Sequence, residues 1–206
     1  MISFEDLTLL RQIDVHCEKC IRFCVYADAV GASDVSMWSS FGNSFAESAV
    51  LHWCRVFGSL REQTHFTRFF EGRSIPMPDG SRLTMERVRT RLCEAAGMTG
   101  DEYARFWENV KKDRDKHLVH TDVKRPAPVT FPDLNVLKGV ALEMRDMIRD
   151  VVLCEEAGDA GKQRKSRGLV LLNGNKKYLR ELEADRVRLK RMMDADTEAS
   201  APGRKG

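Results

Sequence analysis

The sequence predicts an all-α protein, an up-and-down helical bundle followed by a basic C-terminal helical extension. Apolar residues recur at the spacing of amphipathic helices over long segments, whereas alternating apolar and polar runs are few. Helix-capping residues stand where these segments begin and end. The 206 residues, of which 42% are hydrophobic, suffice for one core with an appendage. We expect a bundle over residues 1–157 and a basic linker, a helix and a frayed tail over residues 158–206.

The first helix is expected to begin after Ser3, which forms a capping box with Asp6. It continues until Gly31 and Ser33 interrupt the pattern. Its apolar stripe consists of Leu10, Ile13, Cys17, Cys20 and Cys24. A second helix is expected from about 43 to 57, before Gly58. Its apolar face consists of Phe45, Ala49, Trp53 and Val56.

Residues 70–81 contain glycine and proline signals and predict a loop with a turn. Thr84 is the expected cap of a third helix that ends at Ala96, where Gly97 terminates it. Thr99 and Glu102 form a second capping box, which opens a fourth helix. The apolar residues of that helix are Tyr103, Phe106, Trp107 and Val110.

Three prolines between 126 and 132 predict an extended connector after the fourth helix. A fifth helix follows from about Pro132 to Gly158. Its buried stripe is predicted to be Leu134, Leu137, Ala141, Met144, Ile148 and Val151. Residues 158–168 are small, polar and basic, as in a linker. A basic helix is expected over 176–193, with a frayed tail from 194 to 206.

Cys17, Cys20 and Cys24 have two interpretations, a metal or redox cluster and a core stripe. A zinc site needs a second ligand pair, and none follows nearby. His16 faces a different side of the same helix. Reduced cysteine also behaves as a small buried hydrophobe. We therefore expect core positions and neither a metal nor a cofactor.

The apolar runs favour a protein without a membrane segment. The longest of them, such as 151–154 and 169–172, are far shorter than the roughly 18 residues of a spanning helix. The sequence begins with acids where a secretory peptide would carry basic residues. We therefore expect a cytoplasmic location.

Positive charge is concentrated near the C-terminus. Residues 162–191 contain eleven Lys or Arg and three acids, a net charge of +8, whereas residues 1–161 carry −4. One interpretation is a polyanion partner, with RNA or DNA as the commonest case. The other is a solvated helix face with local ion pairs among Glu181, Asp185 and Arg188.

One short segment combines the side chains of phosphodiester chemistry. Arg114 offers a fixed fork of donors for a phosphate, and His117 and His120 titrate near neutral pH and can move a proton. In a continuing helix His120 would lie about 240° around the axis from Arg114. The two side chains therefore converge only if the helix ends or unwinds there. The candidate RNA-binding residues around them are Lys111, Lys112 and Lys116.

The segment Arg114-Asp115-Lys-His-Leu-Val-His120 resembles the hallmark of the HEPN superfamily. That hallmark is an Arg, a polar residue, and a His after four to six intervening positions. Residues 44–57 also look like the second helix of abortive-infection members. The resemblance covers residues 1–155 and leaves the basic extension outside.

The resemblance implies a helical bundle that dimerises and acts as a metal-independent endoribonuclease of a defence or toxin–antitoxin system. His120 would transfer a proton during attack by the RNA 2′-hydroxyl, and Arg114 would bind the scissile phosphate. Asp115 would orient one of these two, with His117 as a secondary candidate. The implied partners are RNA, a second copy of the chain, and an antitoxin or regulatory protein. Some members carry a modified Tyr where this chain has Asp122, so that mode of control is not expected.

The alternative function is a non-catalytic helical module that binds nucleic acid or an acidic partner protein. Arg114, Asp115 and Lys116 would then be solvated residues at a helix end. We expect His52 and His65 to flank the core. Four arginines have two interpretations, an extension of the RNA-binding surface and local ion pairs with Glu86 and Glu94, and we assign them to neither. They are Arg82, Arg87, Arg89 and Arg91.

Overall fold

The computed structural model describes residues 2–31, 36–77, 79–115, 131–158 and 175–200. Over these ranges the chain is all-α apart from one small hairpin, which confirms the predicted fold class. The helices are α1 (Phe4–Val30), α2 (Ser36–Phe57), α3 (Thr67–Phe70), α4 (Met85–Ala96), α5 (Gly100–Asp113), α6 (Leu134–Gly158) and α7 (Asn175–Ser200). The strands are β1 (Ser74–Pro76) and β2 (Arg82–Thr84).

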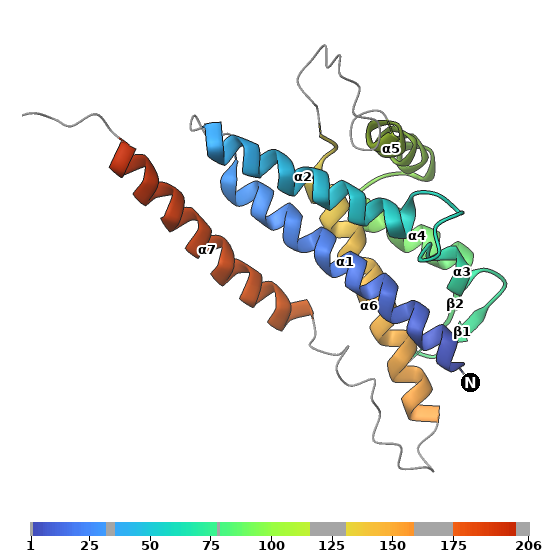
Figure 1. Cartoon of the computed structure of the whole chain (residues 1–206). Coiled ribbons are helices and arrows are strands. Elements are labelled where there is room, and N and C mark those ends of the chain that lie inside the picture. The colour runs from blue at the N-terminus through green and yellow to red at the C-terminus, as the bar shows by residue number, and fades with distance from the viewer. Residues whose placement is uncertain (1, 32–35, 78, 116–130, 159–174, 201–206) are drawn as a thin grey trace, which may run out of the picture.

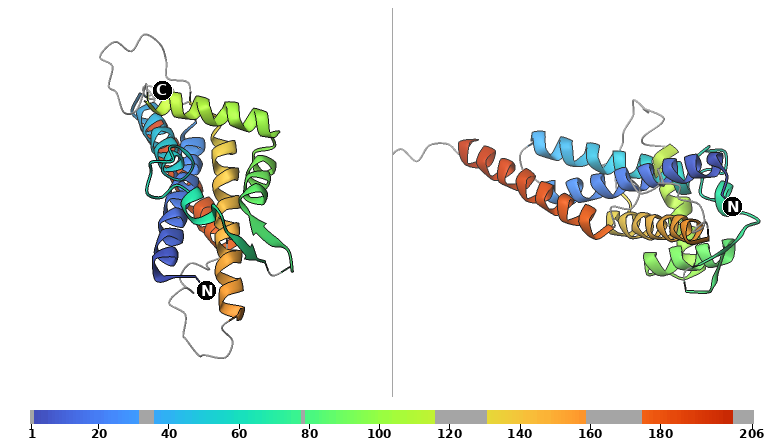
Figure 2. Two further views of the ribbon diagram at one scale, coloured as in Figure 1. Left: turned by 90° about the vertical axis from the view of Figure 1, so that its right-hand side faces the viewer. Right: turned by 90° about the horizontal axis from the view of Figure 1, so that it is seen from below.

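Helix α1 is the centre of the bundle. It lies antiparallel beside α2 and also packs against α6 and α7 (Figure 1). Helix α4 covers another side of α6, and α5 contacts both α2 and α4 (Figure 2). Within the described ranges, no helix has the length and apolar character that crossing a bilayer requires.

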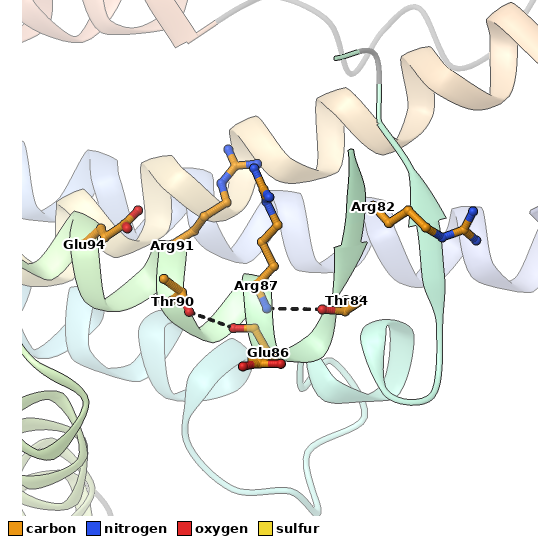
Figure 3. Close-up of a pocket in the computed structure, with 7 residues that line it drawn as sticks. All are labelled: Arg82, Thr84, Glu86, Arg87, Thr90, Arg91 and Glu94. Atoms are coloured by element: carbon orange, nitrogen blue, oxygen red, sulfur yellow. Dashed lines mark hydrogen bonds between the residues drawn. The ribbon is translucent and has the colours of Figure 1, made fainter. Parts of the chain in front are cut away.

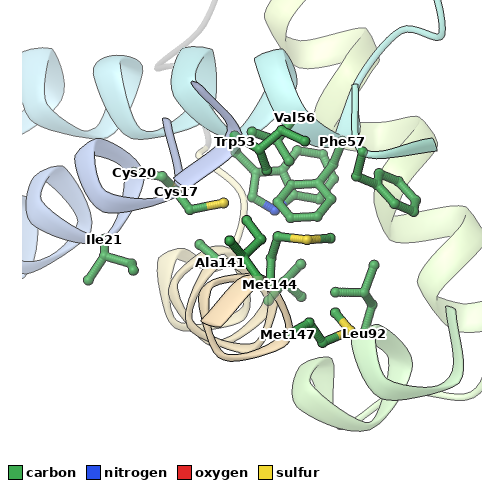
Figure 4. Packing of buried hydrophobic residues seen from close by; sticks show 14 of the residues in the cluster. Cys17, Cys20, Ile21, Trp53, Val56, Phe57, Leu92, Ala141, Met144 and Met147 are labelled. Atoms are coloured by element: carbon green, nitrogen blue, oxygen red, sulfur yellow. The ribbon is translucent and has the colours of Figure 1, made fainter. Parts of the chain in front are cut away.

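The predicted apolar stripes meet in one core. Side chains of α1, α2 and α6 point into it, with Trp53 of α2 fully buried between Cys17 of α1 and Met144 of α6 (Figure 4). The stripes of α1 and α6 are buried almost as predicted, with Leu134 only partly covered. Burial raises the pKa of the Cys17 and Cys20 thiols, so both remain protonated and pack as small hydrophobes.

The predicted helix caps are confirmed. The hydroxyl of Ser3 accepts the Asp6 amide proton at 3.0 Å, and the Asp6 carboxylate accepts the Ser3 amide proton at 3.2 Å. Thr99 and Glu102 form the same box at the start of α5. Gly97 adopts the left-handed conformation that terminates α4, with φ of +65°.

Two helix boundaries and one loop differ from the prediction. Helix α2 begins at Ser36 rather than near 43, because packing overrides a run of serines and a glycine with weak helix propensity. Gly42 lies where a Cβ would meet the Val30 side chain at 3.2 Å, so glycine permits the close approach of α2 to α1. The predicted loop, 70–81, contains β1 and the turn of an antiparallel hairpin whose second strand, β2, follows it, and Ser74 pairs with Thr84. Residues 194–200, predicted as frayed, continue α7 to Ser200.

A buried ion pair joins α1 to α6. Nε and Nη2 of Arg145 lie 2.7 and 3.4 Å from the two carboxylate oxygens of Asp14, and both residues are 7% exposed. Tyr178 of α7 packs its ring on the Arg145 guanidinium, 4.7 Å from the ring centroid. The Tyr178 hydroxyl donates to the Glu18 carbonyl at 2.7 Å. The predicted extension is therefore docked on the bundle, through Tyr178 and the buried Leu182.

Replacing Asp14 by Asn is expected to lower the free energy of unfolding by about 3 kcal/mol, because the buried Arg145 charge loses its hydrogen-bonded counterion and keeps only the Glu18 carboxylate, at 3.9 Å. Urea denaturation measures this loss. Asp28→Asn is the matched control, since the Asp28 pair with Arg186 is exposed and should cost about 0.5 kcal/mol or less. Equal losses in the two variants would contradict this role of Asp14.

Candidate functional site

The candidate site lies at the C-terminal end of α5, which is anchored to α2. The carbonyl of Phe57, the last residue of α2, accepts a hydrogen bond from the indole N–H of Trp107. Phe106 packs edge-on against Trp53, with ring centroids 6.1 Å apart. Val110 is fully buried in the same core. These contacts fix the last turns of α5 beside α2.

Arg114 and Asp115 lie where α5 ceases to be an α-helix. The α-helix ends at Asp113, and the backbone continues as a π-helical turn through Arg114 and Asp115. Such turns are frequent at functional sites. Arg114 itself retains helical φ and ψ of −55° and −52°, and its amide still donates to the Val110 carbonyl, so α5 carries the guanidinium to its C-terminal end.

The Arg114 guanidinium is charged and largely covered. Its side chain is 15% exposed, and Nε and Nη2 lie 2.8 and 2.6 Å from one carboxylate oxygen of Asp115. Burial lowers the pKa of Arg114, but the hydrogen bond to Asp115 and the nearby Cys54 and Glu62 together raise it above its ordinary value. A charged guanidinium held in one orientation suits phosphate binding through its remaining N–H groups.

The predicted lysines have different surroundings. The Lys111 ammonium lies 3.8 Å from the centroid of the Trp107 ring and 3.5 Å from a carboxylate oxygen of Glu108. Lys112 is exposed on the surface of α5. Three of the predicted site residues lie outside the described residues, namely Lys116, His117 and His120. Among the predicted residues, the structure thus brings Arg114 and Asp115 into contact.

Two histidines that the sequence did not combine meet between α1 and α2. The Nδ1 atoms of His16 and His52 are 2.9 Å apart. Burial, His16 and the cations Lys19 and Arg55 lower the pKa of His52 to about 4. Burial and the same two cations also lower the pKa of His16. Both rings are therefore neutral at pH 7, and one nitrogen donates to the other.

His65 is a buried structural residue, in agreement with the predicted position beside the core. It is 2% exposed, and its Nδ1 lies 2.8 Å from the Thr67 hydroxyl and accepts the Thr67 amide proton at 3.3 Å. Burial lowers the pKa of His65 to about 4, although a hydrogen bond with the Phe57 backbone opposes this shift. His65 helps to hold the loop that follows α2.

Three of the four unassigned arginines, Arg82, Arg87 and Arg91, line a pocket of about 530 Å³ (Figure 3). Arg82 and Arg91 have partners outside α4. Arg91 pairs with Glu143 of α6, and Arg82 donates to the hydroxyl and carbonyl of Ser74 at 2.6 and 2.7 Å. None of the residues around the pocket belongs to the Arg114 motif. Arg82 thus links the two strands of the hairpin, and Arg91 joins α4 to α6.

Helix α7 is less basic than the extension as a whole. It contains seven Lys or Arg and six acids, because the residues beyond 193 add negative charge. Several of the charges are paired, with Lys177–Glu181 at 3.8 Å and Arg188–Asp185 at 3.5 Å. The remaining basic residues of the charged stretch, at 162, 164, 165 and 167, lie outside the described residues.

Comparison of the chain with models of protein families, with curated proteins and with solved structures finds no match. In the part of the chain that the structure describes, no three His, Cys, Asp or Glu side chains converge as metal ligands.

Lowering the pH from about 6.5 to about 4 is expected to reduce the free energy of unfolding through His65. Its folded-state pKa of about 4 is below the ordinary 6.5, so the unfolded chain binds the proton first. In His65→Gln this contribution is absent, and the loss between pH 7 and pH 4.5 should be about 2 kcal/mol smaller than in the native chain. Urea denaturation at both pH values tests this, and equal losses would rule out a neutral buried His65.

Proposed function

We propose that the chain is a HEPN-like, metal-independent endoribonuclease that acts through Arg114, Asp115 and His120. One observation carries the proposal. The charged and largely covered Arg114 is held by Asp115 at the C-terminal end of α5. A guanidinium in this setting is suited to a scissile phosphate, and the motif supplies a histidine six residues further along.

The proposed reaction is an internal transfer of the phosphodiester. His120 assists removal of the proton from the 2′-hydroxyl or its delivery to the leaving 5′-oxygen. The 2′-oxygen bonds to phosphorus, the bond to the 5′-oxygen breaks, and the product ends in a 2′,3′-cyclic phosphate. Arg114 stabilises the charge that develops on the phosphate oxygens. Because Asp115 contacts Arg114, we assign Asp115 to orienting the guanidinium.

The proposal extends to the biological setting that the motif implies. The protein would act in the cytoplasm as a homodimer with two motifs in one cleft, as part of a defence or toxin–antitoxin system. RNA is its substrate, and an antitoxin or regulatory protein keeps it inactive. His117 is a secondary candidate for proton transfer, and the exposed Lys112 is a candidate contact for the RNA backbone, with Lys111 and Lys116 beside it.

Purified protein is expected to cleave total RNA in the presence of a chelator and to leave cyclic-phosphate ends. His120→Ala should lower the rate by about 10²- to 10⁴-fold, because proton transfer is lost. Arg114→Ala should lower it by about 10²-fold or more, because transition-state stabilisation is lost. Arg105→Ala is the matched control, an exposed basic residue of the same helix outside the motif, with an expected change of about threefold or less. Gel analysis of cleavage and end-group chemistry measure all four proteins.

The alternative, a non-catalytic interaction module, predicts a different set of results. Native protein and His120→Ala would both leave RNA intact. RNA binding would instead depend on the basic residues at 162, 164, 165 and 167. Substituting these residues by Gln is preferable to deleting 159–206, because deletion would remove Tyr178 from Arg145. Equal cleavage by native protein and His120→Ala would show that the site assignment is wrong.

A further inference from the structure

His16 and His52 form a preorganised pair outside the proposed RNA-cleaving site. They lie on the antiparallel helices α1 and α2, and their Nδ1 atoms are 2.9 Å apart. The two rings have centroids 5.2 Å apart and planes inclined by 35°. The ring of Phe23 stacks on His52, with an interplanar angle of 7°. Both histidines are partly buried, so helix packing fixes the rings while solvent still reaches them.

Two imidazole nitrogens at this distance share either a proton or a metal ion. Metal–imidazole bonds are about 2.0 Å long, so two nitrogens in adjacent positions of a square-planar or octahedral complex are about 2.9 Å apart. Tetrahedral zinc would separate them to about 3.3 Å. The observed distance between the Nδ1 atoms therefore fits the geometry that Cu²⁺ and Ni²⁺ prefer.

The charged residues near the pair are the cations Lys19 and Arg55 and the acid Glu62. A metal ligand must be unprotonated, so an ion would compete with protons for the two rings. Of the two nearby cations, Arg55 is paired with Glu62 at 2.8 Å, so Lys19 is the main repulsive charge. No third His, Cys, Asp or Glu joins the pair among the described residues, so water completes the coordination.

We propose that His16 and His52 form a two-histidine site for a divalent transition-metal ion of the Cu²⁺ and Ni²⁺ class. The ion would bridge α1 and α2 and stabilise their packing. With two protein ligands the site is open and its metal exchangeable. This proposal is independent of RNA cleavage, because no step of the proposed reaction uses His16 or His52.

Calorimetric titration of the untagged full chain with NiCl₂ tests the site. One ion should bind with a dissociation constant on the order of 10 µM. His16→Gln and His52→Gln should each weaken binding by roughly tenfold or more, and the electron paramagnetic resonance spectrum of bound Cu²⁺ should show two nitrogen ligands. The controls are His65→Gln and the double variant His117→Gln with His120→Gln, both of which should bind as the native chain does.

Two further measurements cover a variant that fails to fold. In the native chain, substoichiometric Cu²⁺ should broaden the ring NMR signals of His16 and His52 before those of other histidines. Saturating Ni²⁺ should raise the melting temperature of the native chain, because the ion binds the folded state. Binding that survives both single substitutions, or that depends on His117 and His120, would overturn the proposal. If the metal-site proposal fails in this way, the expected cleavage of RNA in the presence of a chelator is unchanged, because that reaction uses neither His16 nor His52.

Discussion

The carbonyl at the C-terminal end of α2 determines where the candidate site lies. The last carbonyls of a helix have no partner within the helix and need one elsewhere when they are buried. The indole of Trp107 supplies that partner to Phe57, and Phe106 packs beside it on Trp53. Because Arg114 follows Trp107 by about two helical turns, the same contact sets the position of the guanidinium beside α2.

A second constraint is the charge enclosed within the bundle. Asp14 and Arg145 are hydrogen-bonded to each other in surroundings that exclude water, and Tyr178 covers the guanidinium. An unpaired charge in that position would be costly, so the pair fixes how α1 and α6 meet. It also gives α7 a specific place to dock, although α7 carries few buried apolar side chains. The extension is thus part of the bundle, while its outer face remains charged.

Features that lie within a single helix were predictable from the sequence, because the residues that define each of them are close together in the chain. The capping boxes at Ser3 and Thr99 and the buried stripes of α1 and α6 are examples. Features that need two elements were not predictable. The pairs Asp14–Arg145 and His16–His52 join residues far apart in the chain. The hairpin between 74 and 84 gives only three residues to each strand, too few for a periodic signal.

The candidate site was predictable to the same extent. Arg114 and Asp115 stand next to each other in the sequence, and their ion pair follows from that adjacency and from the covered position of Arg114. Cys54 and Glu62, which help to raise the pKa of Arg114, belong to α2 and to the loop after it, and no local pattern marked them. His117, His120 and Lys116 lie outside the described residues, so their roles remain predictions from the motif.

A crystal structure of the protein with an RNA whose 2′-hydroxyls are methylated tests the central claim most directly. The modified RNA binds without being cleaved, because the attacking oxygen is blocked. We predict a backbone phosphate within about 3 Å of both the Arg114 guanidinium and the His120 imidazole. The assignment of this site would be contradicted if the RNA phosphates were bound elsewhere and Arg114 contacted Asp115 but not the RNA.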